Sequence, residues 1–450
     1  MSKETRYKNM AGAGNAGTDQ EMLTELQHES INYFFQQANP ANGLIADKTD
    51  IDSPASIAVV GIALSCYIVA DKQGYLTRPE AAKKTLTTLR FFRDAPQGTG
   101  PYDTGYKGFY YHYLHMETGQ RVWESELSTI DTALLIVGAL TSRAYFDQQN
   151  DVETEIREIA DDLYRRVDWQ WALNGGSTIS HGWKPESGFI NYHWNTGYSE
   201  AMILYILAMG SPTYPISETG YKEWTSTFEW KELYGIHHLY AAPLFIHQLS
   251  HLWIDFRGIH DDFNRKVGID YFENSRRAVH IQQQYAIENP LGFKGYGKTC
   301  WGLSASDGPG PAKLIVDGKQ VTFYNYIARG INWTDDGTLS PWAVAASLPF
   351  APELVLESLR YGIENLNTIK GDSGLHASFN PTFPDKTDKL KGWVSPLQFG
   401  LNQGPVVLML ENYHTGLIWD VVKKCPYITK GLLRAGFGGG WLDGKKEDNE

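Results

Sequence analysis

The sequence predicts an all-α protein, an (α/α)6 toroid with long aromatic-rich loops and one small β-hairpin. About a dozen segments repeat apolar residues with a helical period. Segments that are apolar on all sides alternate, roughly, with segments that are polar on one face. A double ring produces this pattern, because its inner helices are buried and its outer helices are half exposed. The alternative is an irregular helical bundle or two packed helical domains.

The first helices have clear start signals. Thr18-Asp19-Gln20-Glu21 is a capping box that opens helix one, and Thr77-Arg78-Pro79-Glu80 opens helix three in the same way. Helix two follows Ser53-Pro54 and is apolar on nearly all sides. Further helices are expected at 125–146, 152–171, 199–209, 240–253, 260–287, 341–348, 353–365, 396–412 and 416–422, with a short extra one near 224–233. The expected strands are a hairpin of 109–114 with 120–123, and a piece at 321–328.

Length and composition favour one large domain. The chain has 450 residues, of which 42% are hydrophobic, and its 26 Tyr, 19 Phe and 14 Trp supply a large core. We expect a flexible segment over residues 1–17, a single catalytic domain over 18–441 and a polar tail over 442–450.

The charge balance excludes several partners. With 40 basic and 52 acidic residues the net charge is −12, and no basic stripe exists for nucleic acid. A negative membrane surface would repel the chain, so we expect no membrane partner but a neutral one, an oligo- or polysaccharide. Three cysteines provide neither a disulfide framework nor a zinc pair, and no cofactor or metal is expected. Composition carries no information on the oligomeric state.

The N-terminus lacks a hydrophobic signal region, and the longest apolar run, residues 57–70, is too short to span a bilayer. The sequence as written therefore predicts a cytoplasmic protein. A periplasmic or secreted location would follow if a leader peptide had been removed.

Long aromatic segments lead into the apolar helices, notably at 102–126, 183–198 and 292–301. Long loops in a compact fold are usually functional. Aromatic side chains spaced by Gly, Asn and His make good platforms for the apolar faces of sugar rings. Core filling is the alternative interpretation for any single aromatic.

Three acids stand at the start of such helices or beside these aromatics. Asp131 precedes an apolar stretch, where an unpaired acid is costly. Glu200 follows aromatics and precedes an apolar helix, so desolvation should raise its proton affinity, as a general acid requires. Asp307 stands in an Asp-Gly turn signal. Two such acids near aromatic platforms indicate glycoside hydrolysis.

Other chemistries fit less well. The chain has no GxSxG elbow, P-loop or Rossmann fingerprint. His247 and His251 are four residues apart, but no glutamate base lies between them, which favours structural histidines.

Six segments in order carry a family resemblance. They are 108–114, 126–132 (Glu-Leu-Ser-Thr-Ile-Asp-Thr), 197–202 (Gly-Tyr-Ser-Glu-Ala-Met), 253–257, 301–309, and 402–405 with 411–413. Together they resemble the bacterial glucoamylase-like proteins of glycoside hydrolase family 144 and its clan, over residues 18–441. The resemblance implies an (α/α)6 toroid that cleaves β-1,2-glucan to sophorose or longer sophoro-oligosaccharides by inversion, without a metal.

The resemblance also implies site residues. Glu200 matches the general acid. Similar sequences often carry aspartates where this chain has Asn402 and Ala377, so the base would be Asp131, Asp307 or another acid. The residues expected to bind substrate are Tyr113, Glu126, Trp183, Tyr192, Trp194, Tyr198, Arg257, Trp301, Gln403 and Glu411.

Other functions remain compatible with the sequence. These are a transglycosylase, a hydrolase of another glucosidic linkage, and a glycan-binding protein without catalysis. Two other toroid enzymes fit worse. A terpene cyclase would need an Asp-rich motif on a cavity helix, and a uronyl lyase would need an anionic substrate, which the net charge of −12 disfavours.

Overall fold

The computed structural model describes residues 18–366, 369–384 and 392–446. The α-helices are α2 (Asp19–Gln36), α3 (Ile57–Lys72), α4 (Arg78–Asp94), α5 (Thr129–Tyr145), α6 (Asp151–Arg166), α7 (Met202–Gly210), α8 (Glu218–Thr225), α9 (Asp262–Val267), α10 (Tyr271–Glu288), α11 (Pro341–Ala345), α12 (Pro352–Asn365), α13 (Gly400–His414), α14 (Leu417–Val422) and α15 (Pro426–Arg434). Four 3-10 turns complete them: η1 (Trp171–Leu173), η2 (Leu244–His247), η3 (Leu249–Leu252) and η4 (Gly440–Leu442). The described chain is thus mainly helical, as predicted.

The strands are short. They are β1 (Ala55–Ser56), β2 (Gly105–Tyr106), β3 (Phe109–Tyr111), β4 (Tyr113–Leu114), β5 (Leu127–Ser128), β6 (Gly182–Lys184), β7 (Gly188–Phe189), β8 (Trp230–Leu233), β9 (Ile236–Leu239), β10 (Ala305–Ser306), β11 (Ala312–Val316), β12 (Lys319–Phe323), β13 (Ile327–Ala328), β14 (Lys370–Gly371), β15 (Gly374–Leu375), β16 (Phe379–Asn380) and β17 (Trp393–Val394). Most lie in the connections that lead from one helix to the next.

The helices divide into buried and half-exposed ones. Helices α3, α5, α7 and α13 are buried on nearly all sides, whereas α2, α4, α6 and α12 bury one face. Each half-exposed helix packs against a buried one: α2 on α13, α4 on α3, α6 on α5 and α12 on α11. This matches the alternation seen in the sequence, because an all-apolar helix requires neighbours on every side.

The backbones of helices α3 and α5 approach one another closely, and two glycines explain it. A Cβ atom added to Gly138 would lie 2.0 Å from the carbonyl oxygen of Gly61, and one added to Gly61 would lie 2.2 Å from the carbonyl oxygen of Leu134. The two backbones therefore touch where the side chains are absent. This contact holds the N-terminal ends of both helices beside one another, where the candidate acids are found.

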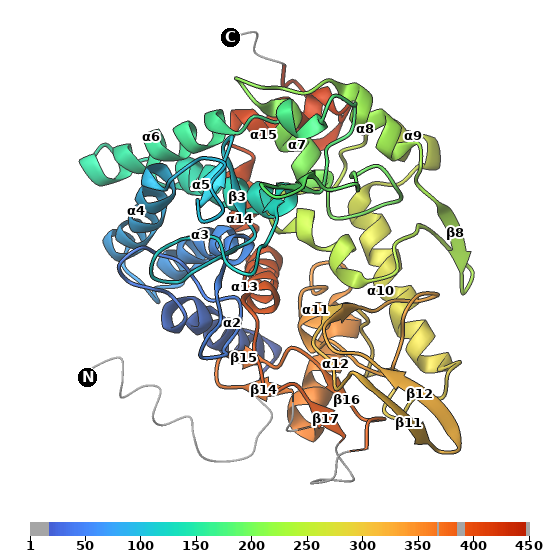
Figure 1. Cartoon of the computed structure of the whole chain (residues 1–450). Coiled ribbons are helices and arrows are strands. Elements are labelled where there is room, and N and C mark those ends of the chain that lie inside the picture. The colour runs from blue at the N-terminus through green and yellow to red at the C-terminus, as the bar shows by residue number, and fades with distance from the viewer. Residues whose placement is uncertain (1–17, 367–368, 385–391, 447–450) are drawn as a thin grey trace.

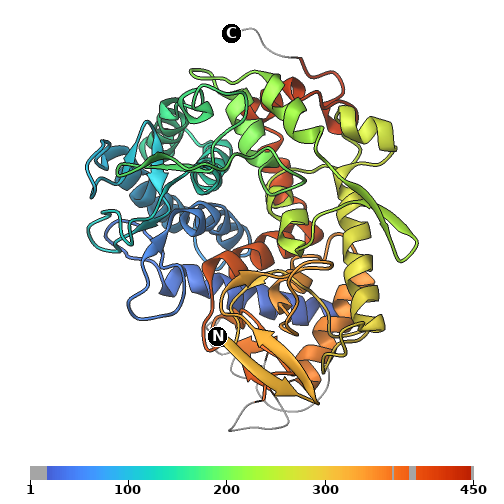
Figure 2. The ribbon, with the colours of Figure 1, turned by 45° about the vertical axis from the view of Figure 1, so that its right-hand side comes forward.

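An early and a late part of the chain pack together. Helix α13 packs on both α2 and α3, and Figures 1 and 2 show the blue N-terminal helices beside the red α13. Arg360 of α12 also pairs with Asp19 of α2, with 2.6 Å between nitrogen and oxygen. One continuous hydrophobic cluster runs from Leu23 to Leu442.

A five-stranded antiparallel sheet in the order β2-β3-β5-β6-β7 replaces the expected single hairpin. Tyr110 of β3 pairs with Ser128 of β5, and Leu127 pairs with Trp183 of β6. The predicted partners 109–114 and 120–123 share only an isolated bridge, between Leu114 and Arg121. The prediction was wrong here because these pairings join segments far apart in the sequence, which local alternation does not show.

Several predicted helices differ from the structure. Residues 240–253 form the 3-10 turns η2 and η3, since Pro243 lacks an N–H and the backbone breaks at Gln248 (φ −120°, ψ −45°). The segment 260–287 is two helices, α9 and α10, because Gly268 ends the first in a left-handed conformation and the Asp270 side chain caps the second. The segment 224–233 is the end of α8 followed by β8, and α15 was missed.

The remaining boundaries are close to those predicted. Both capping boxes, at Thr18 and Thr77, are present. Helix α5 begins at Thr129 rather than at residue 125, because Leu127 and Ser128 belong to strand β5. Residues 1–17 and 447–450 of the predicted terminal segments lie outside the described residues. Among the described helices, none has the length and apolar character needed to cross a membrane.

Candidate active site

The sheet places three predicted site residues, Tyr113, Glu126 and Asp131, next to one another and beside His112. The backbone N–H of His112, between β3 and β4, donates to the carbonyl of Glu126, just before β5, at 2.9 Å. Ser128 then caps α5: its hydroxyl accepts from the backbone N–H of Asp131 at 3.2 Å and donates to Oδ2 of Asp131 at 2.6 Å. The Asp131 side chain is thereby fixed at the start of a buried helix, with Glu126 and Tyr113 nearby.

His112 bridges two of these carboxylates. Its Nδ1 lies 2.9 Å from Oε1 of Glu126, and its Nε2 lies 3.6 Å from Oδ2 of Asp131. Burial lowers the pKa of His112, but Asp131, Glu126 and Asp47 together outweigh burial and raise it to about 9. His112 is therefore an imidazolium at neutral pH. Burial in turn raises the pKa of Glu126, but its bond to His112 prevails and the net pKa is lowered.

Asp47 is a further acid of this group, and the sequence analysis did not include it. It is 8% exposed, and its backbone is fixed from two sides: its N–H donates to Pro54 O at 2.8 Å, and its carbonyl accepts from Gly400 N, the first residue of α13, at 2.9 Å. Burial raises the pKa of Asp47 to about 6, against the opposing charges of His112 and Lys48. Asp47 stands shortly before the all-apolar α3, so the rule that selected Asp131 and Glu200 could also have found it.

Glu200 lies in the turn that leads into α7, where it is partly exposed. Burial raises its pKa to about 7, and the charge of Asp131 adds to this rise. The backbone beside it is tied to η3, because the Ser250 hydroxyl donates to the Glu200 carbonyl at 3.4 Å. Glu200 is thus about half protonated at neutral pH, and Asp131 is close enough to influence its proton.

Asp307 follows β10 and is held by two serines. The Ser395 hydroxyl donates to its Oδ2 at 2.9 Å, and the Ser378 hydroxyl donates to its carbonyl at 2.8 Å. Tyr326 connects it to the other acids: burial raises the pKa of this phenol, and the charges of Asp47, Asp307 and Asp131 raise it further. Tyr326 therefore faces acids from three separate parts of the chain, and the sequence analysis missed it.

The described residues thus bring together five acids and one imidazolium: Asp47, Glu126, Asp131, Glu200, Asp307 and His112. Asp47 and Glu200 both have raised pKa values, whereas Glu126 has a lowered one. General acid and base catalysis requires two neighbouring carboxyl groups, one that is protonated and one that is ionised at the same pH.

One subset could also hold a metal ion. Ligand atoms of His112, Glu126 and Asp131 lie within 4.8 Å of one another. Both ring nitrogens of His112 already face a carboxylate, and its raised pKa favours the protonated ring, which binds no metal. The imidazolium itself supplies the positive charge among these acids.

Several aromatic side chains border the acids. The Tyr113 ring stacks on His112 with centroids 3.9 Å apart, and Trp123, which is 64% exposed, lies 5.1 Å from Tyr113. Trp194 stacks on His181 at 3.8 Å and donates its indole N–H to Thr129, at the start of α5.

The other two predicted platforms in this region differ in exposure. Trp183 in β6 is half-buried against Tyr106 and Trp171. Tyr192 is 71% exposed, and its carbonyl accepts from His181 N at 2.8 Å. Tyr192 is therefore open to a ligand in this structure, whereas Trp183 presents only part of its ring.

Three predicted binding residues belong to the core instead. Tyr198 is 6% exposed and stacks on Tyr271. Trp301 is 2% exposed, and its indole N–H donates to Ser358 at 2.7 Å. Gln403 is fully buried, and its amide donates to Leu375 O. Their side chains are packed by distant segments, so they offer no surface to a sugar.

Arg257 and Glu411 lie at the other end of the helices. Glu411 accepts hydrogen bonds from Gln73, after the C-terminal end of α3, and from Gln27 of α2. It is eleven residues beyond the start of α13, which corresponds to about 16 Å along a helix. Arg257 pairs with Asp255 at 2.7 Å and stacks over Trp419 of α14, which follows α13. These contacts place both residues beside the C-terminal part of α13.

His247 and His251, which the sequence left as structural histidines, are buried and hydrogen-bonded in η2 and η3. His247 Nε2 lies 3.2 Å from Ala241 O, and His251 Nε2 lies 3.1 Å from Ser275 Oγ. Burial lowers the pKa of each to about 3. They are neutral side chains of the core.

Comparison with known proteins establishes the family. The profile of the Glycoamylase family, described as "Putative glucoamylase", matches residues 191–426. A crystal structure from Bacteroides uniformis whose protein carries the same description is 32% identical, covers 96% of this chain and 100% of its own, and superposes with a TM-score of 0.84. The chain therefore belongs to this glucoamylase-like family, and the predicted resemblance is confirmed.

Two relatives have more specific descriptions. An exo-β-1,2-glucooligosaccharide sophorohydrolase (non-reducing end) of Parabacteroides distasonis is 29% identical in an alignment 457 residues long. The alignment covers 93% of this chain. The match spans only 58% of that relative's length. The endo-β-1,2-glucanase of Chitinophaga pinensis, solved with sophorotriose and glucose, is 26% identical with a TM-score of 0.80 and covers 95% of this chain and 100% of its own.

Proposed function

We propose that this protein is a glycoside hydrolase that cleaves β-1,2-glucan or its oligosaccharides by inversion, with Glu200 as the general acid. One observation carries the proposal: Glu200, with its pKa raised to about 7, stands beside a group of acids and exposed aromatics. Two relatives that act on β-1,2-glucans support the choice of linkage.

We infer that the scaffold is an (α/α)6 toroid. The four pairs of a buried with a half-exposed helix support a double layer of helices, and the packing of α13 on α2 and α3 supports a closed ring. The single hydrophobic cluster supports one catalytic domain over residues 18–441. The N-terminal ends of α3, α5 and α7 then point their leading acids, Asp47, Asp131 and Glu200, toward one end of the ring.

The residues divide the reaction as follows. Glu200 donates its proton to the glycosidic oxygen as the bond from the anomeric carbon to that oxygen breaks. A carboxylate, Asp131 or Asp307, takes a proton from the water whose oxygen forms the new bond to the same carbon. Burial, with a smaller contribution from the charge of Asp131, raises the pKa of Glu200 so that it can hold a proton at neutral pH, and His112 holds Asp131 and Glu126 in place. Tyr113 and Tyr192 remain the proposed sugar contacts, whereas Trp194 is 9% exposed and belongs to the core, with its indole N–H bonded to Thr129.

The test is to incubate the protein with a panel of β-1,2-, β-1,3-, β-1,4- and α-1,4-glucans. The release of reducing ends measures hydrolysis, and NMR identifies which anomer is released first. We expect activity on the β-1,2 polymer or its oligosaccharides, with inversion, and a loss of at least about 100-fold in Glu200→Gln. Glu158→Gln, an exposed glutamate on α6, is the matched control and should keep full activity. Full activity in Glu200→Gln, or no product from any glucan, would reject the proposal.

A further inference from the structure

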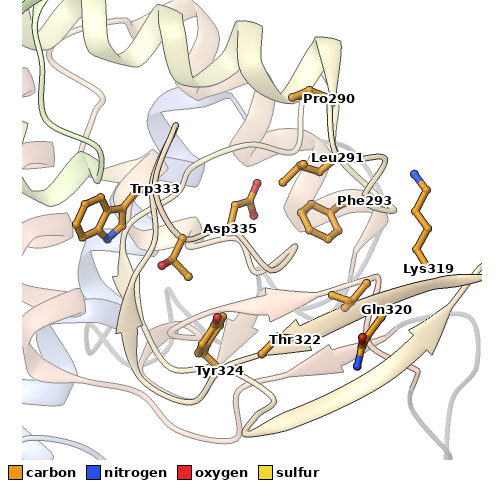
Figure 3. A pocket seen from close by; sticks show the side chains of 11 residues that line it. Pro290, Leu291, Phe293, Lys319, Gln320, Thr322, Tyr324, Trp333 and Asp335 are labelled. Carbon is orange, nitrogen blue, oxygen red and sulfur yellow. The ribbon is translucent and has the colours of Figure 1, made fainter.

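An aromatic-lined hollow lies at the hairpin of β11 and β12. Its volume is about 700 Å³, within the range of small-ligand sites. It is lined by the loop after α10, by β12 and by residues 324–335: Pro290, Leu291, Phe293, Lys319, Gln320, Val321, Thr322, Tyr324, Trp333, Thr334 and Asp335. Figure 3 shows the Trp333 ring at one end, the Lys319 side chain at the other, and Asp335 between them.

The walls of this hollow are fixed. Asp335 accepts hydrogen bonds from the phenols of Tyr285 and Tyr296, at 2.8 and 2.7 Å. The Asn289 side chain bonds to both the N–H and the carbonyl of Phe293, at 2.9 and 2.8 Å. A preformed surface of this kind lowers the entropic cost of holding a ligand.

Its lining suits a neutral ligand with both apolar faces and hydroxyl groups. Trp333 is 69% exposed and Tyr324 is 37% exposed, so two flat apolar surfaces are left in water. Hydrogen-bonding groups stand around them on Gln320, Thr322 and Thr334. The charges of the lining cancel, since Lys319 and Asp335 are its only ionisable side chains besides the phenol of Tyr324. Sugar rings have this combination of surfaces.

The loop that follows β12 connects the hollow to the candidate active site along the chain. Tyr324 lines the hollow, and Tyr326, two residues further along the chain, faces Asp47, Asp131 and Asp307. Both phenol rings are partly exposed, at 37% and 48%. A polymer bound among the acids can therefore pass along this loop to Trp333.

We propose that this hollow is an auxiliary subsite that binds a segment of a neutral glucan chain away from the bond being cleaved. This inference rests on the proposed function, because it takes the glucan as the substrate. In this proposal Trp333 and Tyr324 determine the preference for long substrates. They contact long chains and do not reach a trisaccharide bound at Glu200.

The test compares a long β-1,2-glucan with sophorotriose. In Trp333→Ala we expect KM for the polymer to rise about fivefold, the order of one aromatic contact, with KM and kcat for sophorotriose unchanged. Trp333→Phe should restore most of the polymer affinity. Tyr214→Ala, which removes a 40% exposed tyrosine between α7 and α8, is the control and should change neither substrate. An unchanged polymer KM in Trp333→Ala overturns the subsite.

A binding measurement separates this inference from the proposed function. Affinity electrophoresis in gels containing the polymer needs no hydrolysis, and Glu200→Gln serves as the starting protein. Weaker retardation of Glu200→Gln/Trp333→Ala than of Glu200→Gln supports the subsite, and equal retardation overturns it. Absence of hydrolysis by the wild-type chain rejects the proposed function, whatever the gels show.

Discussion

Glu200 and Asp131 are coupled through their charges, and this coupling sets the pH range of the proposed reaction. A general acid works only while it holds its proton. Burial and the charge of Asp131 raise the pKa of Glu200 to about 7, so the acid form persists at neutral pH and is lost above it. We therefore expect kcat/KM to fall as the pH rises through about 7.

Asp131→Asn tests the coupling. Removing the negative charge should move the pKa of Glu200 downward, because ionisation of Glu200 no longer meets a like charge. Carbon-13 NMR of the labelled glutamate carboxyl measures this pKa without any need for activity. Glu158→Gln should leave the Glu200 resonance where it is. A Glu200 pKa that does not move in Asp131→Asn would show that burial alone raises it.

At the same scale, the sequence predicted the acids better than the aromatics. Asp131 and Glu200 were selected because an acid before an apolar helix is costly without a function, and this argument needs only neighbouring residues. Asp47 obeys the same rule. Trp301 and Tyr198 looked like platforms because they stand in loops, yet Ser358 and Tyr271, which are distant in sequence, bury them. Their burial is decided by tertiary packing.

Among the elements, the α3–α5 pair depends on the close approach of the two backbones at Gly61 and Gly138. Because a Cβ on Gly138 would lie 2.0 Å from Gly61 O, Gly138→Ala must push the two helices apart. We expect the free energy of unfolding to fall by about 1–3 kcal/mol, the usual cost of overpacking, and chemical denaturation measures it.

Separating α3 from α5 should also reduce activity, since Asp131 stands at the start of α5. Gly438→Ala is the matched control, because a Cβ at Gly438 meets nothing within 4 Å and its φ is ordinary. If Gly138→Ala were as stable as the control, the helices would have to be free to move apart without cost.

Helices were predicted well where the pattern is local. Capping boxes and apolar periodicity identified α2, α3 and α4 within a few residues. The sheet in front of α5 could not be predicted in this way, because Leu127 pairs with Trp183 across a whole helix pair. That sheet positions His112 and Glu126, so the geometry of the site depended on contacts that periodicity does not contain.

For the whole molecule, the site and the closure of the fold lie at opposite ends of α13. Its first residue, Gly400, bonds to Asp47 O beside the acids, whereas Glu411 bonds to Gln27 and Gln73 and so ties α13 to α2 and α3. Glu411 was expected in the site and belongs to the segment 411–413, which carries the resemblance together with 402–405. Both segments lie in α13, whose length separates Glu411 from the start of the helix.

Glu411→Ala tests this division. Glu411 is 1% exposed, and its removal takes one of two acceptors from the buried amide of Gln27, which still donates to Val407 O, and the acceptor of Gln73, which is exposed to water. We expect a loss of about 1–3 kcal/mol in the free energy of unfolding, the cost of losing hydrogen bonds to a buried charged group. Below the melting range, kcat and KM should stay within about twofold of wild type. Glu411→Gln keeps an acceptor oxygen and should recover part of the stability. A variant with normal stability and lost activity would show that Glu411 acts in the substrate site. The closure of the fold would then have to depend on the packing of α13 against α2 alone.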